Sequence, residues 1–313
     1  MGRPLGINAV MSAAAETTYG ATPAAGFYRL PFVSHGLGEV QPLLEDDQLG
    51  FGREGLDPTY DVITNDGDIV VPIDTRGIGF WLRQTFGPPS TTAAGDGTFA
   101  HTFTSGAPSI PSTSVEFSNP DMPIHSTHYG AAVNSLKASL TRSGMLNATL
   151  SMIAQGETDP AAVSAAGAPT VLRGSRFAQA TGSITIDGAV VADVVSGDLA
   201  YSNQLDKVEV IRSDGRIAGV DPGKAVSSGS LRTRFATQAL YNKARAKTPV
   251  ALSYGWTLEA FSLIFRLPRV FLPKPKRSIT GPKGIMADFD WQASGADAAQ
   301  LTAVLTNDVA SYA

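Results

Sequence analysis

The feature that most constrains this chain is a strand-to-helix corner that occurs twice. Residues 67–82 read GDIVVPIDTRGIGFWL, and residues 229–244 read GSLRTRFATQALYNKA. Each stretch opens with Gly and then places its larger side chains at every second position, as a β-strand does. After a Thr, the apolar residues change to the spacing of a helix. A corner written twice in one chain indicates an internal repeat.

Most of the remaining chain is typical of β-strands. Alternation or β-rich composition predicts strands at 68–73, 112–117, 132–141, 145–154, 182–195, 207–212, 230–235, 250–258, 261–266 and 285–292. Helical spacing predicts one helix from about Thr75 to Phe86, with Asp74 as its cap, and another from about Gln238 to Lys247, with Thr237 as its cap. The sequence therefore predicts a mainly β chain in which each repeat carries one short flanking helix.

The repeat extends beyond the two corners. The matching pairs are Phe27 with Phe177, Gly38 with Gly188, Val40 with Val190, Leu44 with Val194, Leu49 with Leu199, Phe51 with Tyr201, Gly67 with Gly229, Thr75 with Thr237, and Gly144-Met145-Leu146 with Gly284-Ile285-Met286. Their order is kept while the offset changes, as loop insertions would make it. We therefore predict two domains, 1–156 and 171–313, joined by an Ala-, Gly- and Pro-rich linker at 157–170. The alternative is a chance self-alignment of Gly- and Val-rich β segments.

Composition excludes several classes of function. The chain has 313 residues, of which 43% are hydrophobic, and this suits two domains of ordinary size. It contains no Cys, so disulfides, thiolate metal sites and Cys nucleophiles are excluded. A net charge of −4 does not fit a general DNA-binding protein. No window reaches the roughly 18 apolar residues of a membrane span, so we expect no membrane contact.

Motifs that carry chemistry are weak in this sequence. Residues 50–55 fit G-x-G-x-x-G, but Leu56-Asp57-Pro58 follows where a nucleotide-binding motif requires a helix, so we predict a glycine-rich loop. His125 and His128 lie close together in a segment that we interpret as a loop, without a clear third ligand. No nucleophile elbow or paired catalytic carboxylates occur. We predict that the protein is not an enzyme and binds no metal or cofactor.

Opposite charges are segregated along the chain. Acidic residues concentrate between 39 and 68, where Arg53 is the one base, and basic residues concentrate between 266 and 283. The candidate acidic residues are Glu45, Asp46, Asp47, Asp66 and Asp68, and the candidate basic residues are Arg266, Arg269, Lys274, Lys276, Arg277 and Lys283. Two solvated loops would explain this pattern. The other explanation is an electrostatic contact between subunits, favoured by the apolar Leu267, Val270, Phe271 and Leu272 within the basic segment.

Several stretches together resemble a known family. They include GINAVMSAAAETTYGATPAAGFYRLPFVS, LLEDDQLGFGREG, FAHTFTSG and SIPSTSVEFSN in the first half, and SGDLAYSNQLDKVEVIRSDGRIAGVDPG, LPRVFLPKPKRSITGPKG and LTAVLTNDVASYA in the second. The chain is similar, over essentially its whole length, to the major tail tube proteins of long-tailed, siphovirus-like bacteriophages, and among them to the two-domain type.

The resemblance implies a structural virion protein. Tail tube proteins are β-sandwiches whose strands join into a ring-wide inner β-barrel, and stacked rings form the hollow tube through which DNA is ejected. Two fused domains imply homotrimeric rings with pseudo-six-fold symmetry, with a hexamer as the alternative. The resemblance also implies assembly in the bacterial host cytoplasm, a tape measure protein in the lumen, and contacts with tail terminator and distal tail or baseplate proteins. It implies an acidic or neutral bore, and we expect the candidate acidic residues at the bore or at the seam between rings and the candidate basic residues at a subunit contact.

A virion module that binds carbohydrate is the alternative function. A tandem β-sandwich adhesin of this kind would present Trp and Tyr near a cluster of loops. Trp81, Trp256 and Trp291 instead lie in predicted helices or strands, which favours places in the core. The sequence therefore favours the tail tube interpretation.

Overall fold

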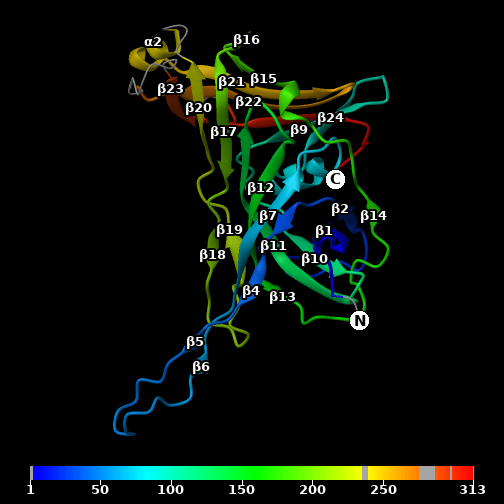
Figure 1. Cartoon of the computed structure of the whole chain (residues 1–313), viewed down its shortest axis with the longest axis vertical. Coiled ribbons are helices and arrows are strands. Elements are labelled where there is room, and N and C mark those ends of the chain that lie inside the picture. Colours follow the sequence, from blue (N-terminus) through cyan, green and yellow to red (C-terminus); the bar gives the residue numbers. More distant parts are fainter. Residues whose placement is uncertain (1–2, 235–238, 275–285, 297, 313) are drawn as a thin grey trace.

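The fold is mainly β (Figure 1) in a computed structural model that describes residues 3–234, 239–274, 286–296 and 298–312. The first strands are β1 (Val10–Ala15), β2 (Tyr28–Leu30), β3 (Ser34–His35), β4 (Gly38–Val40), β5 (Leu43–Leu44), β6 (Thr59–Tyr60), β7 (Thr64–Pro72), β8 (Ser90–Ala93), β9 (Phe99–Thr104), β10 (Thr113–Asn119), β11 (Ile124–Leu140), β12 (Asn147–Ala154) and β13 (Gly156–Glu157). They are followed by β14 (Thr170–Val171), β15 (Gly182–Ile186), β16 (Ala189–Val190), β17 (Val194–Ser202), β18 (Asp206–Val208), β19 (Gly219–Asp221), β20 (Val226–Arg234), β21 (Val250–Leu258), β22 (Phe261–Phe271), β23 (Met286–Ala293) and β24 (Thr302–Asn307). The α-helices of this part of the chain are α1 (Gly77–Phe86) and α2 (Ala239–Ala246), and the 3-10 turns are η1 (Gly6–Asn8) and η2 (Gln179–Thr181).

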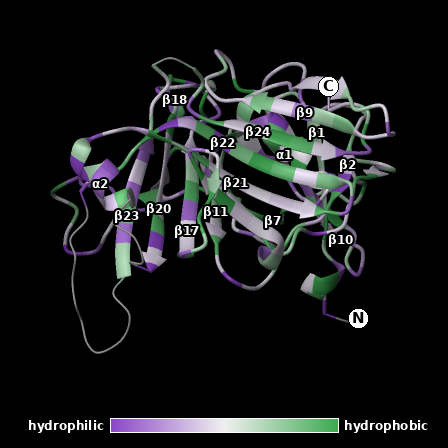
Figure 2. Ribbon diagram, turned by 90° about the horizontal axis from the view of Figure 1, so that it is seen from above, coloured by the Kyte–Doolittle hydropathy of each residue, from purple (hydrophilic) through white to green (hydrophobic). Residues whose placement is uncertain are grey.

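Six strands from distant parts of the chain form one antiparallel sheet, in the order β7–β12–β11–β17–β20–β23. Leu136 of β11 lies opposite both Leu150 of β12 and Tyr201 of β17. Leu231 of β20 likewise lies opposite Phe289 of β23. Figure 2, viewed from above, shows β23, β20, β17, β11 and β7 side by side. Because directly opposed residues share a face, this register places the large apolar side chains on one face of the six-stranded sheet.

The 17-residue strand β11 belongs to two sheets. Its first part pairs with β10 and β13, in a sheet that continues through β1 to β2 and β14. Its second part pairs with β12 on one side and β17 on the other. The register shifts between Val133 and Ser135, and a bulge of this kind bends a strand. One strand therefore joins the lower sheet of Figure 1 to the six-stranded sheet.

A second layer covers the apolar face of the six-stranded sheet. Its strands pair in the order β16–β15–β21–β22–β24–β9–β8, all antiparallel. Here β9, which follows α1, pairs with β24 near the end of the chain, Phe103 lying opposite Ala303. Distant segments therefore interlock in this layer as they do in the six-stranded sheet.

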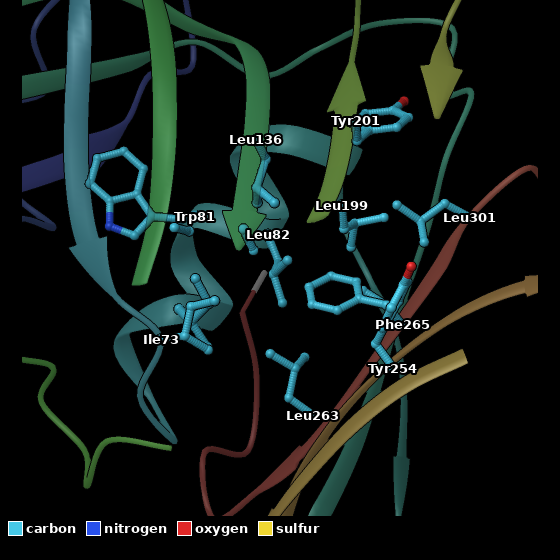
Figure 3. Close-up of a cluster of buried hydrophobic side chains, with 14 of the residues drawn as sticks. Ile73, Trp81, Leu82, Leu136, Leu199, Tyr201, Tyr254, Leu263, Phe265 and Leu301 are labelled. Carbon is cyan, nitrogen blue, oxygen red and sulfur yellow. The ribbon is translucent and has the colours of Figure 1, made fainter. Parts of the chain in front are cut away.

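The core lies between these layers and around α1. Figure 3 shows Leu136 and Leu199 from the six-stranded sheet together with Leu82 of α1 and Phe265 of β22. All four side chains are buried. The three Trp residues, predicted to be core, are Trp81, Trp256 and Trp291, and they are 1–2% exposed. Burying an aromatic side chain of this size contributes about 4–6 kcal/mol of transfer free energy.

Both predicted helices are present. The helix α1 begins at Gly77 and ends at Phe86, two residues shorter at its start than predicted. Asp74 stabilises its first turn, because Oδ1 accepts a hydrogen bond from the Ile78 N–H at 3.0 Å. The helix α2 spans Ala239–Ala246, within the predicted range. Its predicted cap, Thr237, lies outside the described residues.

Four sequence interpretations were wrong in detail. Residues 182–195 are not one strand, because a two-residue turn at Asp187-Gly188, both with positive φ, folds β15 back onto β16. The His125–His128 segment is part of β11 and not a loop. The match of Leu49 with Leu199 pairs unlike environments, since the first is 93% exposed and the second 1%. The match of Phe51 with Tyr201 fails in the same way.

Candidate functional site

The second face of the six-stranded sheet is polar and carries mostly short side chains. The alternation that buries Leu136 and Leu231 turns their neighbours to the opposite face. The residues in the middle of this face are Asp66, Asp68 and Val70 of β7, Asn147, Thr149 and Ser151 of β12, Ser135, Lys137 and Ser139 of β11, Asp198, Ala200 and Ser202 of β17, Ser228, Ser230, Arg232 and Arg234 of β20, and Asp288, Asp290 and Gln292 of β23, and the same register adds Pro72, Ile153, Ser196, Val226 and Met286 near the strand ends. We call this surface the polar face. It contains no aromatic side chain, so it offers nothing on which a base or a sugar ring could stack.

The polar face has an excess of negative charge. Five carboxylates, Asp66, Asp68, Asp198, Asp288 and Asp290, stand against three bases, Lys137, Arg232 and Arg234, which leaves a net charge of −2. Some of these charges are held in place, because Ser230 Oγ donates to Asp198 at 2.8 Å and Arg232 lies 3.5 Å from Asp288. Exposed contacts of this kind each add little stability, so the main effect of these charged residues is the net negative charge of the polar face.

Sequence reasoning identified two of these five carboxylates, Asp66 and Asp68. Asp288 and Asp290 were missed, although they alternate with the buried Phe289 and Trp291 in a strand that was predicted. That alternation alone would have placed both carboxylates on the exposed face of β23. Asp198 lacked such a signal, because the glycine and alanine around it blur the alternation of β17.

The two outer edges of the six-stranded sheet differ. The edge of β7 is covered, because β3 and β4 pair with it along most of its length. Among the described residues, β23 pairs over Met286–Gln292 with β20 on one side, and its other side meets β22 only at Gln292 and Ala293. Over 286–291 the outer edge of β23 therefore presents backbone donors and acceptors without a strand partner in the part of the chain that the structure describes.

A long hairpin projects from one end of the sheet (Figure 1). This arm, residues 41–62, contains β5 and β6, which pair only at Leu43↔Tyr60 and Leu44↔Thr59. It holds three of the predicted site residues, Glu45, Asp46 and Asp47, all exposed. The arm also exposes large apolar side chains, namely Leu43, Leu44, Leu49, Phe51, Leu56, Tyr60 and Val62. Within residues 41–62, six acids stand against Arg53 alone.

The base of the arm is held by the second hairpin, β18–β19. Arg216 forms a two-pronged ion pair with Glu39, with contacts of 2.5 and 2.9 Å. Lys207 Nζ lies 2.5 Å from Asp66 Oδ2, and the Ile63 N–H donates to the Gly215 carbonyl at 2.9 Å. Bidentate Arg–carboxylate pairs fix direction as well as adding energy. The arm is therefore oriented at its base, and no other segment of the described chain contacts its tip through a hydrogen bond or ion pair.

The predicted basic segment is only partly described. Arg266 and Lys274 are exposed and Arg269 is half-buried, whereas Lys276, Arg277 and Lys283 lie outside the described residues. The apolar residues that had favoured an interface here have another role. Leu267, Val270 and Leu272 are buried in the core of their own chain, and Phe271 is exposed. The argument for an interface at this segment therefore rests on its charge and on the exposed Phe271.

Chemistry-bearing clusters are absent from the described residues. His128 is buried against Asn65 and Glu157, and burial lowers its pKa. His125 lies 3.7 Å from the buried Glu116, which accepts hydrogen bonds from the loop at 164–166. No group of three or more metal-ligating side chains occurs within the ranges that the structure describes. The G-x-G-x-x-G segment lies at the tip of the arm, where no helix follows it.

A comparison with protein-family profiles finds one for phage tail tube proteins that matches residues 6–293. The chain belongs to the phage tail tube protein family. A search of curated proteins finds no match. The family consists of structural proteins rather than enzymes, so the tail tube protein is not an enzyme, in agreement with the prediction from its motifs. Within its described residues, neither helix of the tail tube protein has the length and apolar composition of a membrane span.

Proposed function

We propose that this tail tube protein polymerises into stacked rings that form the hollow tube of a phage tail, and that DNA passes through this tube into the host. The observation that carries the proposal is the six-stranded sheet, with one face buried in the core and the other polar, acidic and free of aromatic groups. A wall of this kind suits the lining of a channel, because phosphates are repelled by its charge and find no stacking platform.

The chain is proposed to be a fused pair of tail tube domains, with boundaries at 1–156, 157–170 and 171–313. Strand pairing supports this division. In the first part, β1 pairs with β2 and β10, β10 with β11, β11 with β12, and β12 with β7, which leads into α1. In the second part, β15 pairs with β16 and β21, β21 with β22, β22 with β23, and β23 with β20, which leads toward α2. Three such chains then supply six similar units to a ring.

Ring closure is proposed to use the outer edge of β23. An unpaired edge attracts another strand, and pairing it with the strands at the opposite end of the sheet in the next chain continues the same sheet around a barrel. The contact is head-to-tail, and such contacts generate closed rings when the rotation between neighbours closes. The polar face then becomes the inner wall of the ring.

The charged residues take their roles from this arrangement. Asp66 and Asp68 face the bore with Asp198, Asp288 and Asp290. The other candidate acids, on the arm, lie at the seam between rings, and the basic residues of 266–283 lie at a subunit contact. Before ejection the bore holds a tape measure protein, and the ends of the tube meet tail terminator and distal tail or baseplate proteins. Assembly takes place in the host cytoplasm.

Assembly of the purified protein tests the proposal. Light scattering after size exclusion should give rings of three chains, and electron microscopy should show tubes at higher concentration. Hydrogen exchange should report the ring contact directly, because amides on the outer edge of 286–291 gain protection on assembly. A protein that stays monomeric at every concentration would refute the proposal, and a ring of six chains would refute the fused-pair division.

A second experiment tests the bore. Substituting Asp68→Lys and Asp290→Lys turns the net charge of the polar face from −2 to +2. Tubes of this variant should retain short double-stranded DNA when sedimented at low salt, whereas wild-type tubes should not. Equal retention by both would exclude the polar face from the bore.

A further inference from the structure

A broad groove lies beside the end of β7 where the chain turns into α1. Its volume is about 1120 Å³, and it is lined by segments of β1, β2, the corner at 72–76 and the stretch 171–176. This exceeds the roughly 300–1,000 Å³ that is typical of small-molecule pockets. We call it the arginine groove, because its lining includes Arg29, Arg76, Arg173 and Arg176.

Three of these four guanidinium groups have no acidic partner among the described residues. Arg76 pairs with Asp308 at the surface. Arg29 and Arg173 are exposed without an ion pair within the described chain, and Arg176 donates only to the neutral side-chain oxygen of Asn147, at 2.6 Å. Guanidinium groups are suited to bind carboxylates through paired hydrogen bonds. The groove therefore offers guanidinium groups that could bind the carboxylates of another molecule.

The walls of the arginine groove are partly apolar. Met145 and Val171 are 57% and 65% exposed, and Val33 is 54% exposed. The tip of the arm offers the matching combination. Its side chains Leu49 and Phe51 are 93% and 68% exposed, beside carboxylates without an ion pair in the described chain. Groove and arm are therefore complementary in charge and in apolar surface.

The two surfaces lie at opposite ends of one strand. The arm leads into β7 at Thr64, whereas the arginine groove includes Pro72, the last residue of that strand, and the corner that follows. Because the arm and the groove lie at opposite ends of β7, the arm cannot reach the groove of its own copy. The arm of each copy can instead bind the groove of the next copy, and this contact can repeat along a stack. The 11 residues from Gln41 to Phe51 reach up to about 36 Å at ~3.3 Å per residue, enough to cross a junction between two copies.

We propose that the arm of one copy docks in the arginine groove of a second copy in the next ring, with Glu45, Asp46 and Asp47 facing Arg29, Arg173 and Arg176. This proposal rests on the stacked rings proposed above, and it names the two surfaces that join them. It assigns the acidic arm to the arginine groove and not to the basic segment 266–283, whose apolar residues lie mostly in the core. Opposed charges of this kind select partner and register.

Charge reversal tests the contact. The arm variant carries Glu45→Lys, Asp46→Lys and Asp47→Lys, and the groove variant carries Arg29→Glu, Arg173→Glu and Arg176→Glu. Each alone should leave rings intact and reduce mean tube length at least tenfold in electron micrographs. The variant that combines all six substitutions restores opposite charges in the contact, so its tubes should regain wild-type length.

A matched control reverses three acids of the other hairpin, Asp206→Lys, Glu209→Lys and Asp221→Lys. These residues are exposed and have no ion pair within the described chain, so the control should form normal tubes. Tubes of normal length from the arm variant would overturn the docking proposal and leave the proposed function standing. A combined variant as defective as its parents would also overturn it. A wild-type chain that forms no rings would instead refute the proposed function.

Cross-linking gives a direct readout, because the natural chain has no Cys. A chain carrying Asp47→Cys and Arg173→Cys should form a ladder of disulfide-linked chains in oxidised tubes, visible on a non-reducing gel. The control pair, Asp206→Cys with Arg173→Cys, should give no ladder. The absence of a ladder from the first pair in well-formed tubes would overturn the docking proposal.

Discussion

The corner between β7 and α1 depends on one buried carboxylate, and its removal should be costly. Asp74 is 0% exposed. Its Oδ1 accepts from the N–H groups of Ile78 at 3.0 Å and Arg76 at 3.2 Å, and its Oδ2 accepts from the Gly174 N–H at 3.0 Å. One side chain therefore stabilises the start of the helix and fixes the segment 171–176 against it.

The magnitude follows from the donors that Asp74→Ala would leave unpaired. Loss of a helix cap costs about 1 kcal/mol. A buried N–H without a partner, here that of Gly174, costs about 1–3 kcal/mol. Burial raises the pKa of Asp74, so removing the desolvated carboxylate returns part of this loss. We expect a net decrease of about 2–3 kcal/mol in the free energy of unfolding.

Urea unfolding at pH 7, followed by Trp fluorescence below the concentration of ring formation, measures this decrease. Asp74→Asn keeps one acceptor oxygen and should lose about half as much. Asp308→Ala is the control, because it removes only the exposed ion pair with Arg76 and should cost less than about 1 kcal/mol. A loss from Asp74→Ala no larger than that of the control would refute the reasoning.

Three further predictions concern the sheet, pH and the arm. Gly229→Ala should lower the free energy of unfolding by about 1–3 kcal/mol, measured by thermal unfolding, because the added Cβ would lie 2.1 Å from the Asp198 carbonyl oxygen and 2.5 Å from the Trp291 ring. An unchanged free energy of unfolding would mean that β17 and β23 move apart to make room for the methyl group without cost. Burial lowers the pKa of His128 from 6.5 to about 4, so the unfolded chain takes up a proton first as pH falls below 6.5, and stability should drop by up to ~1.4 kcal/mol per pH unit until the folded group also titrates. His128→Gln should make unfolding curves less sensitive to pH between 6.5 and 4, and an unaltered slope would contradict this. Replacing residues 45–58 with a Gly-Ser linker should leave the melting temperature of the subunit unchanged while preventing tubes, and a lower melting temperature would show that the arm supports the fold.

Local patterns predicted both helices and most of the longer strands, but not all of the strands. Alternation identified long strands such as β7, β10, β11, β12 and β20–β23 but missed β1, β9, β17 and β24, and the stop signals after Phe86 and Lys247 ended both helices close to the correct residues. The burial of the three Trp residues followed from their places in a predicted helix and in predicted strands. These signals are local, so they can be seen in a single sequence.

Long-range pairing could not be predicted from the same patterns. Nothing near Phe103 indicates that its partner is Ala303, and nothing near Leu136 indicates Tyr201. The partner of a strand depends on register and topology, which alternation leaves open. The arginine groove was missed for the same reason, because its bases come from three separate segments and never form a run of charge.

The sharing of β11 between two sheets has a mechanical consequence. Any hinge between the two parts of the chain would have to break the ladder between β11 and β17, and the pairing of β9 with β24 would resist it as well. The subunit is therefore a stiff block. In the proposed tube, bending would therefore occur where one copy meets the next, so the flexibility of the tube would be set by the proposed contacts of the arm and not by the fold.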